Sequence, residues 1–261
     1  MRLFAQSRVK ATEREGNHVE TAGVHHAARR DGAIGCIVQE NRRGMNSPRP
    51  KRVAILIALL SVAAAIIAVP SIRDPILRAA GWALVATEPI MPADIIVISA
   101  DSGGAGALEA ADLVKRGIAT RVAVFTDPPS REDLEFIRRG LPYEDGAERQ
   151  IRQLKWLGIT DVVRIPRPEA GTESEGQVLP PWSDQHQLRS IVFVATRDHS
   201  HRTRRILSRA MSGHQTRVSV QSASYSVFDP DRWWKSRDGI RTEIIELQKL
   251  LLDAVLHPRP F

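Results

Sequence analysis

Short apolar runs alternate with helical segments from residue 93 onward, and this alternation limits the possible folds more than any other feature of the chain. The runs are continuously apolar, which is typical of strands that are covered on both faces. Strands that are joined through helices by short connections form a parallel sheet with helices on both sides. The sequence therefore predicts a Rossmann-like α/β domain over residues 93–256, a three-layer sandwich around a mainly parallel sheet.

The elements of this domain can be placed on the sequence. The predicted strands are 94–99, 121–126, 161–165, 190–195 and 217–220. The predicted helices are 107–116, 132–139, 144–157, 173–188, 199–211 and 233–256. Pro180 and Pro181 should break or kink the helical segment 173–188, because proline lacks the backbone donor and its ring crowds the preceding turn. The last helix has apolar residues at spacings of three and four, as an amphipathic helix does.

A run of 17 residues without charge, from Val53 to Val69, precedes the domain. At about 1.5 Å per residue it approaches the thickness of a bilayer core. Arg49, Lys51 and Arg52 flank its N-terminal side, and positive residues stay in the cytoplasm. We expect residues 53–72 to be a single-pass anchor in the inner (plasma) membrane, with a cytoplasmic N-terminus and an extracytoplasmic main domain. A cleaved signal peptide and a buried core helix are the alternatives.

The remaining segments are short or polar. Residues 1–52 carry eleven Lys and Arg against five Asp and Glu, show no periodicity and are expected to be disordered. The alternative is a start at Met45, directly before the basic flank. We expect residues 73–92 to be a linker or short helix and 257–261 a tail. The rest of the chain, residues 53–261, is nearly neutral in net charge, which argues against a nucleic-acid partner.

Ligands of such sheets bind at the carboxyl ends of the strands, so the residues after each strand are the candidates for a site. After the first strand, Asp101, Ser102 and Gly103 form a glycine-containing turn before a helix. Backbone N–H groups and the helix dipole favour an anion there. The spacing matches neither a dinucleotide fingerprint nor a Walker loop, and a tight turn with a helix cap is the alternative.

Thr196, His199 and Arg202 follow the fourth strand. His199 and Arg202 are three residues apart at the start of a helix and share a face. A hydroxyl, a guanidinium and a helix N-terminus together suit a phosphate or carboxylate, and a histidine moves protons near neutral pH. A capping or surface histidine is the alternative. We expect a solvated face for most of the other arginines here, Arg197, Arg204, Arg205 and Arg209.

Thr172 and Glu175 follow the third strand. Their spacing fits a capping box, with Thr172 as the cap. In the functional interpretation, the Glu175 carboxylate is directed at the same cleft as His199. This interpretation is compatible with the capping box. The sequence shows no residue spacing typical of a zinc or calcium site. Trp233 and Trp234 are interpreted as core or as an interface with the membrane or the domain.

The order of these pieces resembles the YdcF/SanA/ElyC-like family, long catalogued as domain of unknown function 218. The resemblance covers about residues 93–252 and the anchor. Residues 194–202 are similar to the family's Thr-Ser-x-x-His-x-x-Arg segment, and 171–175 to its Asn-Thr-x-Glu-Asn/Glu segment. The chain departs from the family in the first loop, which lacks an Arg before Arg116, and in the missing Asn before Thr172. In the last helix, Arg241, Glu243 and Glu246 fall where the family often carries Arg and Glu.

The resemblance implies an envelope or peptidoglycan function for a membrane-tethered domain. We expect binding of an anionic small molecule, phosphorylated or nucleotide-like, or of a lipid-linked precursor. Acid/base chemistry of a hydrolase or transferase on the phosphorylated substrate is one interpretation of the site. The expected catalytic residues are His199 and Glu175, and the expected ligand contacts are Asp101, Ser102, Gly103, Thr172, Thr196 and Arg202. A second hypothesis is a non-catalytic partner of cell-wall synthesis proteins. A third is a methyltransferase-like enzyme, whose cofactor S-adenosylmethionine is described for one family member but is scarce outside the cytoplasm.

Overall fold

The structure is a computed structural model that describes residues 50–86 and 88–258. The predictions for the N-terminal tail, including the start at Met45, lie outside the described residues, and so does most of the C-terminal tail. The described residues belong to one compact unit that begins at Pro50.

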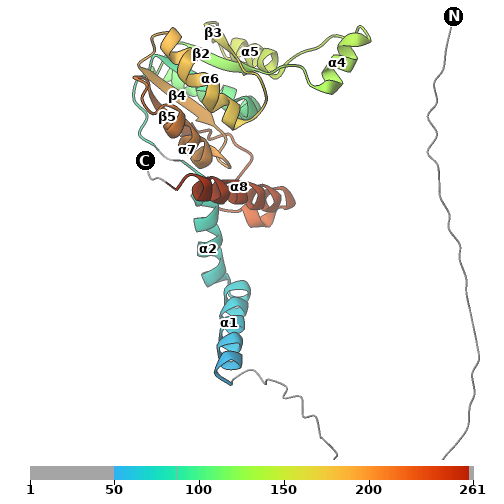
Figure 1. Ribbon diagram of the computed structural model, residues 1–261, viewed down its shortest axis with the longest axis vertical. Helices are drawn as coiled ribbons and strands as arrows, with labels where there is room; N and C mark the ends of the chain where they lie inside the picture. Colours follow the sequence, from blue (N-terminus) through green and yellow to red (C-terminus); the bar gives the residue numbers. More distant parts are fainter. Residues whose placement is uncertain (1–49, 87, 259–261) are drawn as a thin grey trace, which may run out of the picture. The chain divides into compact units, whose positions relative to one another are not determined.

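Five parallel strands form one sheet in the order β3-β2-β1-β4-β5 (Figure 1). The central strand is β1, whose Val97 is aligned with Ala123 of β2 and Phe193 of β4. The strand order reverses between β1 and β4, which is where sheets of this kind bind ligands. The predicted α/β class with a parallel sheet is confirmed, and the strand order is consistent with a Rossmann-like sandwich. The strands are β1 (Ile95–Ile98), β2 (Val122–Thr126), β3 (Val162–Pro166), β4 (Ser190–Ala195) and β5 (Arg217–Ser222).

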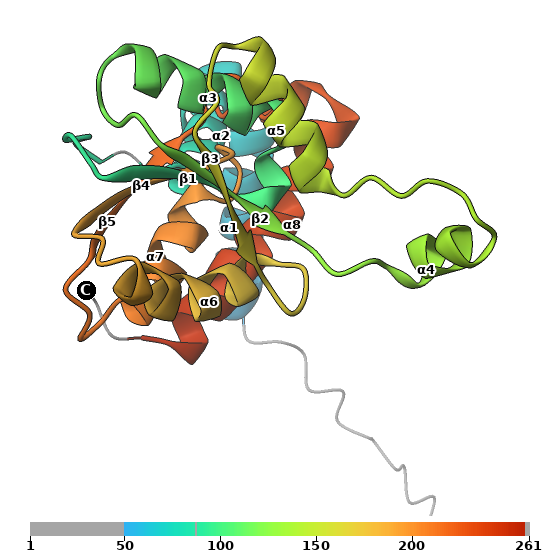
Figure 2. The same ribbon diagram turned by 90° about the horizontal axis from the view of Figure 1, so that it is seen from above.

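Helices cover both faces of the sheet (Figure 2). On one face, α3 (Gly103–Lys115) and α5 (Gly146–Trp156) pack with Ile96, Ile98 and their neighbours. On the other face, α6 (Thr172–Gln185) and α7 (Ser200–Ala210) pack with Ile95, Val97 and the residues around them. Because successive side chains of β1 enter opposite layers, the strand is apolar at every position.

The remaining helices lie outside these two layers. They are α1 (Pro50–Ala68), α2 (Pro70–Ala83), α4 (Arg131–Arg138), α8 (Arg237–Leu256) and two 3₁₀ turns, Ala100–Ser102 and Trp233–Lys235. Helix α4 buries none of its residues and lies away from the sheet in both views (Figures 1 and 2). None of the helices within residues 50–86 and 88–258 has the length and hydropathy of a membrane span.

Helix α6 corrects one expectation from the sequence. It runs from Thr172 to Gln185 without a break at Pro180 and Pro181. The neighbouring Leu179 is fully buried in the core, and the Ser183 hydroxyl donates a hydrogen bond of 2.8 Å to the Pro180 carbonyl. Tertiary packing therefore outweighs the backbone donors that the two prolines lack.

Helix α2 covers the first part of residues 73–92, where a linker or short helix was expected, and Leu84 and Ala86 after it are buried in the core. One expectation is wrong at the other edge of the domain. The predicted last helix is interrupted at Ser236, which caps α8 by accepting a hydrogen bond from the Gly239 N–H. The buried residues of α8 include two carboxylates, and several of its apolar residues are exposed: Ile240, Ile244, Leu251, Leu252 and Val255.

Candidate functional site

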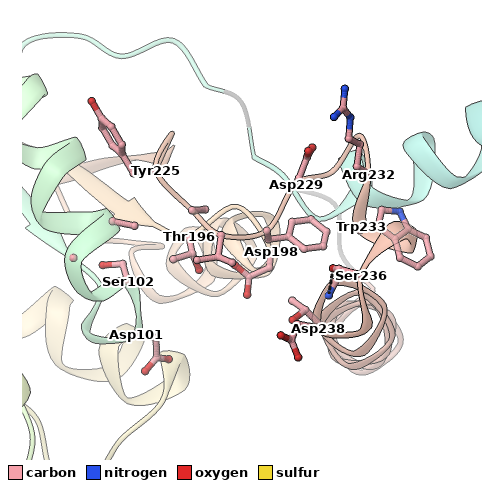
Figure 3. Close-up of a pocket in the computed structure, with 17 residues that line it drawn as sticks. Asp101, Ser102, Thr196, Asp198, Tyr225, Asp229, Arg232, Trp233, Ser236 and Asp238 are labelled. Atoms are coloured by element: carbon pink, nitrogen blue, oxygen red, sulfur yellow. Dashed lines mark hydrogen bonds between the residues drawn. The ribbon is translucent and has the colours of Figure 1, made fainter.

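A cavity of about 610 Å³ lies at the carboxyl edge of the sheet (Figure 3). Its wall comes from the start of α3, the connection from β4 to α7, the segment 225–229 and the start of α8. Thr196 and Asp198 lie between Ser102 on one side and Ser236 and Asp238 on the other (Figure 3). The size is typical of a site for a small molecule.

Three of the predicted ligand contacts, Asp101, Ser102 and Thr196, line this cavity. The other predicted site residues, Gly103, Thr172, Glu175, His199 and Arg202, are not part of the cavity wall that the structure describes. Thr172, His199 and Arg202 lie in a polar cluster around α7, Glu175 lies in a second cluster at the end of β1, and Gly103 is in the turn after β1.

The turn after β1 is tight. Gly103 has a φ of +49°, a conformation that favours glycine. The Ser102 hydroxyl donates a hydrogen bond of 2.6 Å to the Ser99 carbonyl, so it is engaged within the turn. A Cβ at Gly106 would lie 2.0 Å from the Ser102 hydroxyl oxygen and 2.6 Å from Ile98. The Ser102 hydroxyl therefore stabilises the turn, as the tight-turn alternative predicts. The Asp101 side chain remains exposed at the cavity.

The charge of the cavity wall differs from the sequence-based expectation. The wall carries four carboxylates and the single guanidinium of Arg232 among its described residues. An anion inside the cavity would be repelled by this excess of negative charge. Groups that donate hydrogen bonds, such as hydroxyls, are better suited to it. The four carboxylates are Asp101, Asp198, Asp229 and Asp238.

His199 is 6% exposed and stands at the N-cap position of α7. Its Nδ1 lies 2.9 Å from the Thr196 hydroxyl and 3.4 Å from an Asp198 carboxylate oxygen. Its Nε2 is buried and finds no partner in the described part of the chain. Burial opposes charging of the ring, but the hydrogen bond to Asp198 and the charges of Asp198 and Glu246 outweigh it, so the pKa of His199 is raised.

Arg202, one turn along α7, is only weakly paired. Its Nη2 lies 3.4 Å from the Thr172 hydroxyl and 3.5 Å from a Glu246 carboxylate oxygen. Its Nε is buried without a partner among the residues described. Because a guanidinium has five N–H donors, much of the hydrogen-bonding capacity of Arg202 is unused.

Among the other arginines of α7, Arg205 and Arg209 differ from the expected solvated face, whereas the Arg204 side chain is 41% exposed. Arg204 pairs with Glu88 at 2.8 Å. Arg205 and Arg209 both bind Asp253 of α8 at 2.6 Å. These ion pairs attach α7 to its neighbours, and they leave Arg202 as the weakly paired arginine of this group.

Glu175 is fully buried beneath the end of β1. Its carboxylate accepts hydrogen bonds from the Ser99 hydroxyl at 3.1 Å and from the Ala100 N–H at 2.9 Å, and Arg167 lies 3.4 Å away. Burial raises the pKa of Glu175 to about 7, against the opposing effects of the Ala100 N–H and Arg167. The capping-box prediction is wrong, because Gly171 is the N-cap of α6 and Glu175 is directed at β1.

Arg167 is the residue of this cluster that the sequence interpretation missed. Its buried guanidinium joins Asp127, at 2.9 Å, to the Gly171 carbonyl, at 3.0 Å, and it also contacts Phe125. Arg167 directly follows β3 and Asp127 directly follows β2, so a search of strand ends for opposite charges could have found the pair.

Glu243 on α8 was also missed as a site residue. Its side chain is 2% exposed, and neither carboxylate oxygen has a hydrogen-bond partner among the described residues. Burial raises the pKa of Glu243 to about 7. In the sequence it was named only because the last helix resembles that of the YdcF/SanA/ElyC-like family, and it was not assigned to the site.

A comparison with models of known protein families and a search of curated proteins find no match to this chain. The resemblance to the YdcF/SanA/ElyC-like family therefore stays a prediction.

Proposed function

We propose that this chain is a YdcF-like domain of envelope biogenesis that binds a phosphorylated small molecule or lipid-linked precursor at the carboxyl edge of its sheet. The phosphate lies at the first turn of α7, and the remainder of the molecule extends into the adjacent cavity. This arrangement places the anion outside the cavity itself, whose wall carries four carboxylates, and next to only one of them, Asp198, which pairs with His199.

The observation that carries the proposal is a set of buried polar atoms on one face of α7. His199 Nε2, Arg202 Nε and the Thr203 hydroxyl all lack partners within the described residues. They are three and four residues apart, so they share a face of the helix. Buried polar groups usually have partners, and the oxygens of a phosphate would supply them here. The His201 N–H at the start of α7 already donates a hydrogen bond of 2.9 Å to the Leu84 carbonyl, so the proposed contacts with the phosphate come from the side chains.

The pairing of Asp198 with His199 supports a role in proton transfer. Burial opposes ionisation of Asp198, but its hydrogen bond to His199 and the charge of that ring outweigh it and lower the pKa. With Nδ1 directed at Asp198, the ring can take or give a proton at Nε2. The three contacts of Glu175 favour a positioning role for it, because they hold the start of α6 against the end of β1.

Attachment to a lipid bilayer is part of the same proposal. It is supported by the uncharged run from Val53 to Val69 and by the exposure of the α1 side chains Ile55, Leu59 and Leu60. Protease treatment of intact and permeabilised cells tests the predicted orientation. Cleavage of the main domain in cells whose inner membrane is intact supports an extracytoplasmic location, and protection there contradicts it.

The alternative, a non-catalytic partner of cell-wall synthesis proteins, is favoured by helix α4. Its side chains Leu134, Phe136 and Ile137 are exposed on a helix without buried residues. Crosslinking from α4 in membranes distinguishes this alternative from ligand binding.

The test of ligand binding is a thermal-shift screen of the full chain with inorganic phosphate, sugar phosphates, nucleotides and polyprenyl phosphates. A ligand at 100 times its dissociation constant adds about 2.7 kcal/mol of stability. We expect Arg202→Ala and His199→Ala to abolish the shift, and Arg204→Ala, on the same helix but paired with Glu88, to retain it. An undiminished shift in the double variant of His199 and Arg202 would end the proposal.

A further inference from the structure

Each cation of the proposed anion site has a carboxylate beside it. His199 Nδ1 lies 3.4 Å from a carboxylate oxygen of Asp198, and Arg202 Nη2 lies 3.5 Å from a carboxylate oxygen of Glu246 on α8. When His199 is protonated, these four described residues carry two positive and two negative charges. The proposed function uses the two cations and gives Glu246 no role, although its charge affects which anions this turn can hold.

Glu246 is held beside Arg202 by contacts on both of its carboxylate oxygens. One oxygen faces Arg202, and the other accepts a hydrogen bond of 2.6 Å from the Lys249 ammonium at the surface of α8. The Arg202 guanidinium also lies 3.4 Å from the Thr172 hydroxyl, so side chains from α6, α7 and α8 meet there. The side chains of Arg202 and Glu246 are only 15% and 12% exposed. Solvent therefore screens the charge of Glu246 poorly at this point.

The charge of Glu246 also acts on His199. Burial lowers the pKa of the His199 ring, whereas the Asp198 hydrogen bond and the charges of Asp198 and Glu246 raise it. The positive charge of Arg202 lowers it again by a smaller amount, and the net shift is upward. Glu246 thus influences both side chains that are proposed to bind the anion, although it belongs to another helix.

Phosphate monoesters and phosphodiesters differ in the charge that such a site must accommodate. A monoester carries nearly two negative charges above its second pKa, about 6, whereas a diester carries one. The attraction of an anion to a site grows in proportion to its charge, but the cost of removing it from water grows with the square of the charge. A site whose own cations are balanced by carboxylates offers little extra attraction to offset that cost. It is therefore suited to an anion of single charge.

We propose that the phosphate bound at α7 is a phosphodiester, with a single negative charge, and that Glu246 is the residue that determines this specificity. Glu246 acts through its charge and through Arg202, without contacting the ligand. The inference rests on the proposed function and narrows its ligands. A precursor that is joined to its lipid through a diphosphate belongs to this class, because each of its phosphates carries one charge, whereas a sugar 1-phosphate does not.

The first experiment compares dimethyl phosphate with methyl phosphate, which differ by one methyl group and one charge. Their binding to the full chain is followed through the ¹⁵N resonance of His199 at pH 8, above the second pKa of the monoester, about 6. We expect the wild type to bind dimethyl phosphate more tightly. Glu246→Gln removes the charge and keeps an acceptor for Arg202, so its affinity should rise about tenfold more for methyl phosphate than for dimethyl phosphate.

Two control variants separate the charge of Glu246 from other effects. Glu246→Asp keeps the charge on a shorter side chain and should retain the wild-type preference for the diester. Glu173→Gln removes an exposed carboxylate of α6, next to Thr172, and should also leave the preference unchanged. A loss of preference in Glu173→Gln equal to that in Glu246→Gln would contradict a specific role of Glu246.

The second experiment needs no ligand. The pKa of His199, followed by NMR in the free protein, should fall in Glu246→Gln, because a charge that raises it is lost. A purely structural role of Glu246 would not move this titration. The pKa should be unchanged in Glu173→Gln, and a pKa of His199 that is also unchanged in Glu246→Gln overturns the inference.

The inference and the proposed function fail in different ways. Absence of binding of both methyl phosphate and dimethyl phosphate to the wild type contradicts the proposed function, and the inference with it. Tighter binding of methyl phosphate by the wild type at pH 8, above the second pKa of about 6, overturns the inference and leaves the anion site in place. An equal gain for both ligands in Glu246→Gln has the same meaning.

Discussion

Glu175 and Glu243 are two buried carboxyls with the same raised pKa, about 7, and burial is the principal cause in each case. Their surroundings differ. Glu175 contacts Ser99, the Ala100 N–H and Arg167 at the end of β1. Glu243 has no hydrogen bond to a described residue and lies beside an apolar cluster. The two carboxyls therefore share a raised pKa and differ in whether hydrogen-bond partners hold them in place.

The same difference exists among the arginines. Arg167, Arg205 and Arg209 bind carboxylates closely and connect elements of the fold. Arg202 makes two long contacts and keeps a buried Nε without a partner in the described residues. We therefore expect substitutions in the first group to affect stability and substitutions of Arg202 to affect binding.

The largest expected effect tests the structural side of the comparison. Arg167→Ala leaves the buried Glu175 carboxylate without its cation and should lower the free energy of unfolding by about 3–5 kcal/mol. Urea unfolding measures this loss. Arg164→Ala, an exposed arginine two residues before the end of β3, should change stability by less than about 1 kcal/mol. A similar small loss for Arg167→Ala would show that its buried pairs contribute little.

The next effect is the pH dependence of stability that Glu243 causes. Because the folded-state pKa is raised from 4.5 to about 7, its contribution is present below pH 4.5 and is lost as the pH rises through 7. Glu243→Gln cannot titrate, so the variant should gain stability relative to the wild type over this range, on the order of 2–3 kcal/mol. Thermal unfolding at a series of pH values measures the difference, and parallel curves for the two proteins would contradict it.

The smallest effect sharpens the comparison at Glu175. Ser99→Ala removes one of its donors and should cost about 1 kcal/mol, measured by urea unfolding. It should also raise the pKa of Glu175 further, because the lost hydrogen bond favours the charged form. An unchanged titration of this carboxyl, followed by NMR, would show that the Ser99 hydroxyl has no part in holding it.

The sequence predicted the sheet well because its strands are apolar at every position, a pattern that depends on local composition. It also placed Asp101, Ser102 and Thr196 at the sheet edge, where they line the cavity. Arg167 and Glu243 were missed because their significance depends on burial, which arises from packing between segments far apart in the chain. The continuous helix through Pro180 has the same explanation, since contacts with the core hold it.

The central claim is that an anion binds at the first turn of α7, and the Nε2 atom of His199 reports on it directly. In protein with ¹⁵N-labelled histidine, addition of inorganic phosphate should shift the Nε2 resonance of His199 in a saturable manner. The resonances of the exposed His186 and His257 should stay in place. The shift should disappear in Arg202→Ala and persist in Arg204→Ala. An unchanged His199 resonance at saturating phosphate would contradict an anion site at this turn.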